Sequence, residues 1–505
     1  MADENKTLRF AGDFRLDIAT IVSYRSDPDQ QSQPLRLDIK NSLIALSVVE
    51  DIGMECVSGE LTLTDNVDIR TLLPLTGMER LEFRFWTPGW GYNQKCEALE
   101  GITESFYIYK IDKIRPVGGT GRGQVYRLQF VSREAYRNGI CRVSKAFKGP
   151  VENAVYEIVK NTKYLDSRKR LFIEETSTNT KMVIPTEKPF DAIDMLANSA
   201  VSTKYKGGSF VFFETMEGFH FRSIESLMAI GGATARPVTR RFRRTQAAVR
   251  DSKGNRNIAE DMDMVAEYKF EDPINMMENI NDGVLANRLI THDIFNKSFT
   301  TTDFDYHESF KDYYHTEHDY LGTKSKHKYL LPHTPFDNTR KALSEQPTSK
   351  IMYKSGTTRL HNEYESVPHT LSKQSAVSQR YQLMSNHLVL TVPGDTNLHA
   401  GQMINFEMPY MKPVGPGEKQ EINPYFAGRY LILQLKHTVD QTSGQHDMVL
   451  RCVKDSVLNR LPIETNKDMV DLRGKTRDQV VNINKKDEEF IRAHQSSVMN
   501  SGPPR

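Results

Sequence analysis

The sequence has little cysteine, no long apolar run and almost no excess of either charge. Its four cysteines form no Cys-x-x-Cys pair, so zinc-ribbon and thiol redox motifs are absent. This pattern is typical of reduced, mostly buried thiols in a protein made in a cytosol. No run of about 18 apolar residues occurs, which predicts no membrane-spanning helix. The charged residues 1–10 do not resemble a signal peptide, so we expect the protein to reach an outside location only by assembly.

The balance of basic and acidic residues limits the kinds of partner that this protein can be expected to bind. The 67 basic and 65 acidic side chains leave a formal net charge of +2, whereas dedicated nucleic-acid binders usually carry a strongly basic domain. Local basic patches remain compatible with this total. With 505 residues, and about 100–200 residues per domain, we expect three or four domains.

Motifs of catalysis are also missing. There is no P-loop, no Gly-x-Ser-x-Gly and no His-Glu-x-x-His. The glycine-rich stretch Gly118–Gly123 is not followed by the helix that a phosphate cradle needs, so we interpret it as a hairpin loop. No pattern marks two carboxylates facing each other across a cleft, as a glycosidase requires. The sequence therefore predicts no catalytic, cofactor-binding or metal-binding residues, no cofactor and no enzyme.

Two groups of side chains are candidate binding sites. His315 and His318 could lie on one face of a helix, but a metal site needs further converging ligands, and the flanking residues are polar. The other histidines of this group are His307, His327 and His333. An aromatic group could form a carbohydrate platform, although aromatic residues at period 2 more often pack in a core or interface. It consists of Phe83, Phe85, Trp86, Trp90, Tyr107 and Tyr109.

What the sequence does contain is mostly period-2 alternation, which predicts strands with one buried and one wet face. Alternating segments include residues 35–39, 61–64, 81–85 and 106–109. Two segments with helical spacing, each introduced by proline, predict helices over residues 150–159 and 189–197.

Two β segments repeat the same pattern, which indicates two copies of one antiparallel β domain separated by about 300 residues. The first runs from Leu81-Glu-Phe-Arg-Phe85 through Tyr109, Ile111 and Ile114 to Leu128-Gln-Phe-Val131. The second runs from Met403-Ile-Asn-Phe406 through Tyr430, Ile432 and Leu435 to Leu450-Arg-Cys-Val453.

Three polar segments interrupt this pattern. Residues 233–263 include a basic stretch, 236–256, which we interpret as a solvated loop or, alternatively, as a contact for phosphate or an acidic partner. Residues 321–379 are expected to form an insertion or connector, and residues 461–505 a charged C-terminal tail.

Three sets of segments, taken in order, resemble the baseplate central hub family of T-even-type contractile-tailed phages, which is related to the spike hubs of type VI secretion systems. The first set is Ile44-Ala-Leu-Ser-Val-Val-Glu-Asp51, Glu60-Leu-Thr-Leu-Thr-Asp65, Leu72-Leu-Pro-Leu-Thr-Gly77, Tyr109-Lys-Ile-Asp112 and Leu128-Gln-Phe-Val-Ser132. The second is Val183-Ile-Pro185, Pro189-Phe-Asp-Ala-Ile193, Gly208-Ser-Phe-Val-Phe-Phe-Glu214 and Gly218-Phe-His-Phe221. The third is Leu388-Val-Leu-Thr-Val-Pro-Gly394, Ala400-Gly401, Tyr425-Phe-Ala-Gly-Arg-Tyr430, Lys436-His437 and Val453-Lys-Asp455. The polar segments described above depart from the family pattern.

This resemblance implies an α+β, β-dominated fold with two tail-tube-like antiparallel β-barrel or sandwich domains and a mixed middle domain. We assign residues 1–135 to the first tube-like domain, 208–232 and 380–460 to the second, and 136–207 and 264–320 to the middle domain.

The resemblance also implies a structural role and a set of partners. The implied protein is a homotrimer in the virion tail baseplate, assembled in the host cytoplasm. It joins the sixfold tail tube to the threefold central spike, contacts other baseplate (wedge) proteins, and forms a channel through which phage DNA passes without sequence-specific binding. The alternatives are a tail-associated peptidoglycan hydrolase and a carbohydrate-binding receptor protein.

Overall fold

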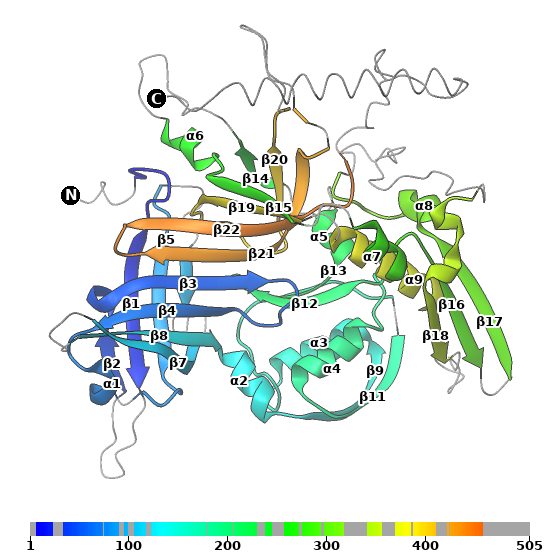
Figure 1. Cartoon of the computed structure of the whole chain (residues 1–505). Helices are drawn as coiled ribbons and strands as arrows, with labels where there is room; N and C mark the ends of the chain where they lie inside the picture. The colour runs from blue at the N-terminus through cyan, green and yellow to red at the C-terminus, as the bar shows by residue number, and fades with distance from the viewer. Residues whose placement is uncertain are drawn as a thin grey trace, which may run out of the picture. The chain divides into compact units, whose positions relative to one another are not determined.

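The alternating segments of the first 132 residues form an antiparallel β domain in the computed structural model of the chain (Figure 1). The strands follow the order β2-β1-β5-β7-β8-β4-β3, with β6 beside β5. Inward side chains such as Leu61, Phe83 and Phe130 are buried in one core. The elements are β1 (Arg15–Ser23), β2 (Leu35–Asp38), β3 (Leu43–Asp51), β4 (Ser58–Asp65), α1 (Ile69–Leu72), β5 (Arg80–Trp86), β6 (Lys95–Ala98), β7 (Phe106–Val117) and β8 (Gly123–Ser132).

The description covers most of the chain up to residue 457. The described residues are 7–23, 34–73, 75–89, 95–98, 106–117, 123–177, 179–205, 207–229, 238–244, 257–271, 275–293, 297–317, 341–355, 369–384, 387–410, 422–423 and 425–457. The predicted C-terminal tail, 461–505, lies outside them.

A second β domain is built from segments that are far apart in the sequence. Its strands follow the order β15-β19-β22-β21-β20-β14 around a separate core that includes Phe242, Leu390 and Leu450. The backbone N–H of Val265 donates to the carbonyl of Arg243, so the segment just before β15 lies beside the end of β14, while β15 itself pairs only with β19. The elements are β14 (Val238–Arg243), α6 (Ile258–Met262), β15 (Glu267–Glu271), β19 (His387–Pro393), β20 (Met403–Glu407), β21 (Gly428–Asp440) and β22 (Gln445–Val453).

The two β domains share one strand order, because β3-β4-β8-β7-β5 corresponds to β15-β19-β22-β21-β20. Leu61 pairs with Leu128, and Leu390 pairs with Leu450 in the same way. The strand repeat expected from the sequence is therefore present. Its alignment within β7 is displaced, because Ile111 is opposite Leu128 and Leu435 is opposite Leu450, so Ile111 matches Leu435 rather than Ile432. Two bulges in β7 shift the register, and a sequence pattern does not reveal them.

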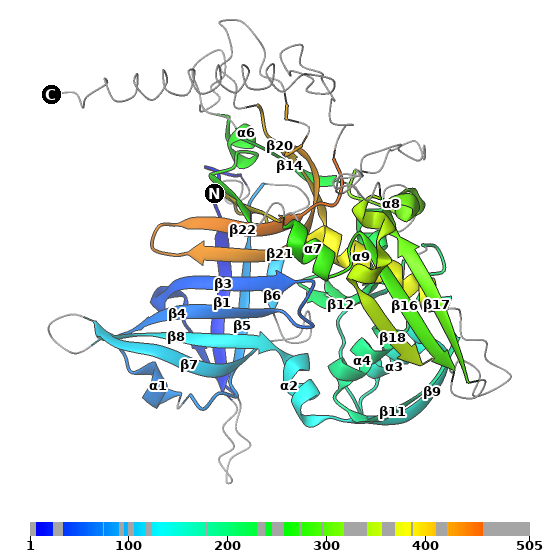
Figure 2. The same cartoon turned by 45° about the vertical axis from the view of Figure 1, so that its right-hand side comes forward.

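The two β domains are joined through β21. This strand pairs with β22 along one edge; along the other edge it pairs first with β20 and then, from Gln434 to Asp440, with β3. One continuous sheet therefore crosses from one β domain to the other, as the adjacent strands β22, β21, β3 and β4 show in both views (Figures 1 and 2). We call the β21–β3 pairing the seam.

A middle domain follows the first β domain and packs α3 and α4 against strands around a third core. The two helices predicted over residues 150–159 and 189–197 are confirmed. The elements are α2 (Arg133–Ile140), β9 (Val143–Pro150), α3 (Val151–Lys160), β10 (Leu171–Ile173), β11 (Asn179–Glu187), α4 (Pro189–Ala197), β12 (Phe210–Thr215), β13 (Gly218–Ser223) and α5 (Ile224–Met228).

Strands β12 and β13 differ from the expected placement of residues 208–232 in the second β domain. They pair with β10 in a sheet of the middle domain, and Phe210 and Phe212 belong to its core. The opposite face of β12 carries Val211 and Phe213, which pack against Met403 and Leu431 of the second β domain. Both faces of β12 are buried, so its alternating aromatic pattern fits either neighbour.

The remaining elements form a smaller unit around the three-stranded sheet β17-β16-β18. Its helix α9 is polar yet packed, and the Gln374 amide donates to the carbonyls of Asn287 and Thr302. The elements are α7 (Met276–Asn281), β16 (Ala286–Asp293), β17 (Ser298–Asp305), α8 (Tyr306–Ser309), β18 (Ile351–Ser355) and α9 (His369–Met384). Short 3-10 turns cover Lys40–Ser42, Phe310–Asp312, Leu343–Glu345 and Pro347–Ser349.

Three boundaries therefore differ from the sequence prediction. Residues 238–243 and 258–262, expected in a loop, form β14 and α6; residues 267–271, expected in the middle domain, form β15 of the second β domain. The insertion 321–379 contains β18 and the start of α9. Each of these segments gains its order from distant pairing or packing, which local composition does not encode.

Candidate functional site

The seam is built around a buried carboxylate, Glu50 of β3. Its Oε2 accepts from the backbone N–H of Ala400 at 2.9 Å, and its Oε1 accepts from the N–H of Met216 at 2.8 Å and lies 3.0 Å from Nδ1 of His399. Burial alone would raise the pKa of Glu50, but the His399 ring and these hydrogen bonds outweigh it, so the pKa lies below its usual value. The carboxylate thus fastens β3 to the second β domain and to the β12–β13 turn.

Two histidines of the second β domain lie on the apolar side of the same seam. Nδ1 of His437 in β21 is 3.0 Å from Nε2 of His446 in β22, and both rings meet the edge of Phe85 from the first β domain. Burial lowers the pKa of His437 to about 4 and that of His446 well below its usual value. Both imidazoles are therefore neutral at pH 7 and serve as core groups.

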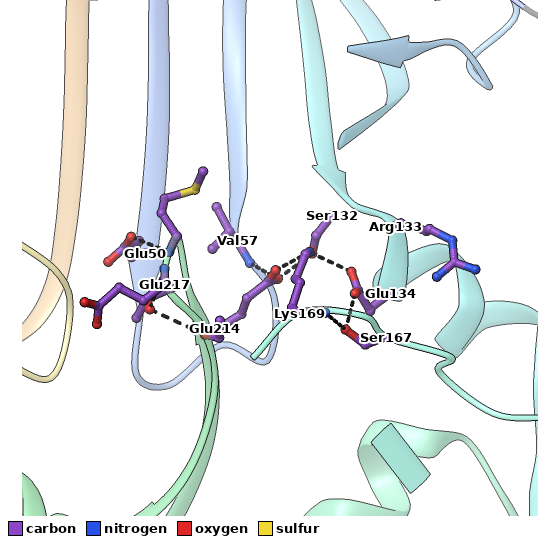
Figure 3. Close-up of polar contacts among 12 residues, drawn as sticks. Glu50, Val57, Ser132, Arg133, Glu134, Ser167, Lys169, Glu214 and Glu217 are labelled. Carbon is purple, nitrogen blue, oxygen red and sulfur yellow. Dashed lines mark hydrogen bonds and ion pairs between the residues drawn. The ribbon is translucent and has the colours of Figure 1, made fainter. Parts of the chain in front are cut away.

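A second buried polar cluster joins the first β domain to the middle domain (Figure 3). Nζ of Lys169 lies 2.8 Å from Glu134 and also contacts Glu214 of β12. Glu214 in turn accepts from the backbone N–H of Val57 at 2.9 Å and from the hydroxyl of Ser132. One cation between two carboxylates therefore holds three segments together.

The pKa values of the three charged groups in this cluster are shifted in different directions. Burial would lower the pKa of Lys169, but the two carboxylates keep it above its usual value. Burial would raise the pKa of Glu134, but the neighbouring ammonium and hydroxyl keep it below its usual value. Burial together with the Glu134 charge raises the pKa of Glu214. Since all three side chains are enclosed and engaged, the cluster provides cohesion between domains rather than a surface for substrate.

Among the repeated strands that the structure describes, two edges that occupy equivalent places are open, namely one side of the outer half of β7 and one side of β15. The half of β7 beyond Ile108 pairs only with β8, while the corresponding half of β21 pairs with both β22 and β3. Likewise β15 pairs only with β19, while its counterpart β3 pairs with both β4 and β21. The seam thus uses one pair of edges and leaves the equivalent pair free.

The histidine group does not converge in the described part of the chain. His315 lies in an extended segment, buried, with Nδ1 2.6 Å from Asp455 and Nε2 2.7 Å from the carbonyl of Phe310. His307 belongs to α8, and the other members, His318, His327 and His333, lie outside the described residues. The expected helix placing His315 and His318 on one face is not formed at His315, because this segment is held by Asp455. Among the described residues, no group of three or more potential ligands is arranged for a metal ion.

The remaining candidates are mostly structural. Phe83 and Phe85 are buried in the first core, as the packing interpretation expected, and the indole of Trp86 donates to Asp17. The glycine-rich stretch connects β7 to β8, since Val117 pairs with Gly123, in agreement with a hairpin. Trp90 and residues 118–122 lie outside the described ranges.

The described part of the basic stretch makes ion pairs within the chain. Arg240 lies 3.3 Å from Asp263 and 3.4 Å from Asp395, and Arg241 lies 3.2 Å from Glu407. The guanidinium of Arg244 covers the ring of Tyr268. These contacts account for Arg240, Arg241 and Arg244 as parts of the folded domain, while residues 236–237 and 245–256 of the stretch lie outside the described ranges.

Sequence patterns missed the buried charged residues that join the domains. Glu50 occupies an inward position of an alternating strand, and Glu214 lies in a strand that is buried on both faces, so an apolar residue is expected at each position. That conflict with the alternation was the available signal. The partners His399 and Lys169 come from loops and could not be inferred from local pattern.

Comparison with known proteins finds similar solved structures but no matching family. No family model and no curated protein matches the chain. Solved structures similar to it include a tail protein from Neisseria meningitidis, with TM-score 0.45, 9% identity, and 89% of this chain and 98% of that chain covered. Another is the 43 kDa tail protein of a Shewanella oneidensis prophage, with TM-score 0.45, 8% identity, and 87% and 99% covered.

A third similar structure is a component of the Escherichia coli type VI secretion system, described as similar to bacteriophage T4 tail proteins. Its TM-score is 0.37 at 8% identity, covering 88% of this chain and 77% of that chain. Identities and scores of this size do not assign the chain to a family. The fold itself is β-dominated α+β, with a large, mostly antiparallel sheet, as expected from the sequence. Within the described residues, no helix is long and apolar enough to cross a membrane.

Proposed function

We propose that this chain is a structural hub protein of a contractile phage tail baseplate, acting as a trimeric adaptor and not as an enzyme. The observation that carries the proposal is the seam, in which two β domains of the same strand order join edge to edge through β21 and β3. The equivalent edges, namely the side of β7 away from β8 beyond Ile108 and the side of β15 away from β19, have no strand partner among the described residues.

A second copy of the chain can supply the missing partners. If β7 of one copy pairs with β15 of the next, the contact repeats the geometry of the seam. This contact is heterologous, and it closes into a ring when the rotation between successive units suits it. With two similar β domains per chain, three copies give six similar units in a ring.

The parts of the chain that occur only once can supply the threefold symmetry. The middle domain and the β16–β18 sheet occur once per chain, so a trimer presents each of them three times. Such a ring can offer a nearly sixfold face to the tail tube and a threefold face to the central spike. We assign the protein on this basis to the virion baseplate, assembled in the host cytoplasm, with wedge proteins as further neighbours and DNA passing through the ring.

One feature of β7 disfavours pairing of its free edge with a strand of another copy. Lys110, Lys113, Arg115 and Pro116 lie on its outer half, and charged residues and proline are means by which edge strands avoid pairing. The same residues would disfavour incorrect contacts while a specific partner strand is absent.

Light scattering of the full chain across a concentration series tests the proposal. A mass near three times 57.9 kDa, with imaging of a pseudo-sixfold ring, is the expected result. A monomer at every concentration, also in the presence of the spike protein, would contradict the adaptor. Zymogram and glycan-binding assays would then test the hydrolase and receptor alternatives.

A further inference from the structure

A buried histidine joins the β16–β18 unit to the end of the second β domain. His315 follows the 3-10 turn Phe310–Asp312, and its partner Asp455 lies two residues beyond β22. Nδ1 of His315 is 2.6 Å from Oδ2 of Asp455, and Nε2 is 2.7 Å from the carbonyl oxygen of Phe310. The imidazole also stacks on the Phe310 ring, with the two centroids 3.6 Å apart. The His315 ring is therefore held at both of its nitrogens and on one of its faces.

The backbone that follows His315 is held by the same segment. The N–H and the hydroxyl of Thr316 both donate to Oδ1 of Asp455, at 3.0 and 2.9 Å. The N–H of Glu317 donates to the hydroxyl of Ser456 at 2.9 Å. All of these side chains are buried. We call the contacts of His315, Thr316 and Glu317 with Asp455 and Ser456 the His315 clamp.

Both polar neighbours of the His315 ring are hydrogen-bond acceptors. A carbonyl oxygen and an ionised carboxylate can only accept. A neutral imidazole carries one N–H and one lone pair, so it would donate to one neighbour and turn its lone pair toward the other. An imidazolium donates from both nitrogens and satisfies both neighbours. The geometry therefore favours a proton on each nitrogen of His315, with Asp455 as the balancing charge.

The charges around the ring favour the same state. Burial alone would lower the pKa of His315, but Asp455 and the Phe310 carbonyl outweigh it and keep this pKa above its usual value. Burial alone would raise the pKa of Asp455, but His315 and the hydrogen bonds from Thr316 keep it below its usual value. The two side chains thus form a buried ion pair at neutral pH. Loss of the histidine proton would leave Asp455 buried without its cation, which is strongly destabilising.

Three further charged groups surround the clamp. Burial raises the pKa of Glu225 in α5 to about 7, and the ionised form of this carboxyl favours the charged form of His315. Lys454, directly after β22, donates to the carbonyl of Ala427 at 3.0 Å, and burial lowers its pKa to about 8 despite the nearby Glu317. Near neutral pH, His315 and Glu225 therefore bind more protons in the folded chain than in the unfolded chain, whereas Lys454 responds only above about pH 8.

We propose that the His315 clamp is a pH-dependent fastening, which holds residues 310–317 on the end of β22 at neutral pH and loosens as the pH rises. The stability contributed by such a histidine is complete below its unfolded pKa of about 6.5 and is lost as the pH rises through the higher pKa of the folded state. Loosening gives the β16–β18 unit more freedom relative to the second β domain. The seam responds in the opposite direction, because His437 and His446 are neutral in the folded chain.

Hydrogen exchange of the full-length chain, followed by mass spectrometry between pH 6.0 and 8.0, tests the clamp. The reporters are the amides of Thr316 and Glu317, because both donate to clamp residues. Their rates are corrected for the pH dependence of exchange in unprotected amides. In the wild type, protection of the peptide covering 310–317 should fall above pH 6.5, by up to about tenfold per pH unit. The amides of α3, which belongs to another core, should keep their protection and show that the chain is folded.

Four variants separate the protonation of His315 from a purely structural role. His315→Gln cannot carry the second proton, so protection should be low at every pH and most of the fall should vanish. Asp455→Asn removes the charge that favours the imidazolium, so its fall above pH 6.5 should disappear. Glu225→Gln, which removes the other group that loses a proton near pH 7, should keep most of the fall. His292→Gln removes an exposed histidine of β16 in the same unit and should behave like the wild type.

Two results would overturn the proposal. One is wild-type protection at residues 310–317 that stays constant from pH 6.0 to 8.0 after the correction. The other is a folded His315→Gln variant that keeps the wild-type dependence on pH, since another group would then control the segment.

Discussion

His437 and His446 lie side by side in the second β domain with Nδ1 and Nε2 3.0 Å apart, and Phe85 of the first β domain packs on both rings. Two neutral imidazoles are thereby enclosed where the two β domains meet. Since burial lowers the pKa of both rings, the folded chain takes up fewer protons in acid than the unfolded chain does.

Acid is therefore expected to destabilise the contact around these histidines. Their contribution to stability is complete above the unfolded pKa of about 6.5 and is lost as the pH falls toward 4 and below. At pH 4.5, His437 alone would lower the free energy of unfolding by roughly 2 to 3 kcal/mol relative to pH 7.5. Urea unfolding at several pH values, for the wild type and a His437→Gln, His446→Gln variant, measures it.

Other groups titrate in the same range, so the difference between the two proteins is the informative quantity. His315 beside Asp455 has a raised pKa, and burial raises the pKa of Glu225 to about 7; both favour the folded state as the pH falls. Both are present in wild type and variant alike. A variant as acid-sensitive as the wild type would contradict the prediction.

Replacing Lys169 by methionine is expected to lower the free energy of unfolding by about 3 to 5 kcal/mol, because Glu134 and Glu214 would then be buried without their cation. Chemical denaturation measures the effect. Lys145→Met, which removes an exposed pair with Glu157, is the control and should change little.

Removing both carboxylates as well distinguishes charge from packing. A Lys169→Met, Glu134→Gln, Glu214→Gln variant should recover part of the stability, since no uncompensated charge remains. If the triple variant is as unstable as the single one, packing around the lysine stem decides the effect.

The proposed contact between copies makes a prediction about one residue pair. In the seam Asp440 is opposite Ala45; by strand correspondence their equivalents are Val117 of β7 and Glu267 of β15. A Val117→Cys, Glu267→Cys variant should form disulfides between copies on mild oxidation, giving a closed three-chain species on non-reducing gels. Val117→Cys with Val183→Cys, placed on the exposed surface of β11, should not. Only chance dimers in both variants would contradict this pairing.

Gly59 of β4 is required for close packing of the first β domain. A Cβ there would lie 2.3 Å from both the Phe130 ring and the carbonyl of Ser47, so Gly59→Ala should cost about 1–3 kcal/mol or more. Thermal unfolding measures it. Gly139→Ala in α2 is the matched control, since nothing lies within 4 Å of its Cβ, and it should leave stability equal or slightly higher.

The strands were predictable where one face is apolar and the other wet. Residues 81–85 and 106–109 were recognisable as strands because successive side chains of a pleated strand point to opposite faces, which produces a period of two in the sequence. The helix α3 was predictable for the same reason, since Val151, Val155 and Ile158 recur at helical spacing.

The remaining assignments depended on distant contacts. Arg240 and Arg241 suggested a loop, yet β14 forms because β20 supplies backbone hydrogen bonds and acidic residues elsewhere in the chain pair with the arginines. The joining residues Glu50 and Lys169 are polar groups whose partners are far away in the sequence. The local period of a sequence shows which face of a strand or helix is apolar, but it does not show which other element packs against that face.

The strand β21 gives its first half to the second β domain and its second half to the seam with the first. Neither β domain can release this strand without exposing the edge of the other. The two should therefore melt together in a single transition. A pulling force applied to one should reach the other as shear along the Gln434–Asp440 ladder, where several hydrogen bonds must break at once.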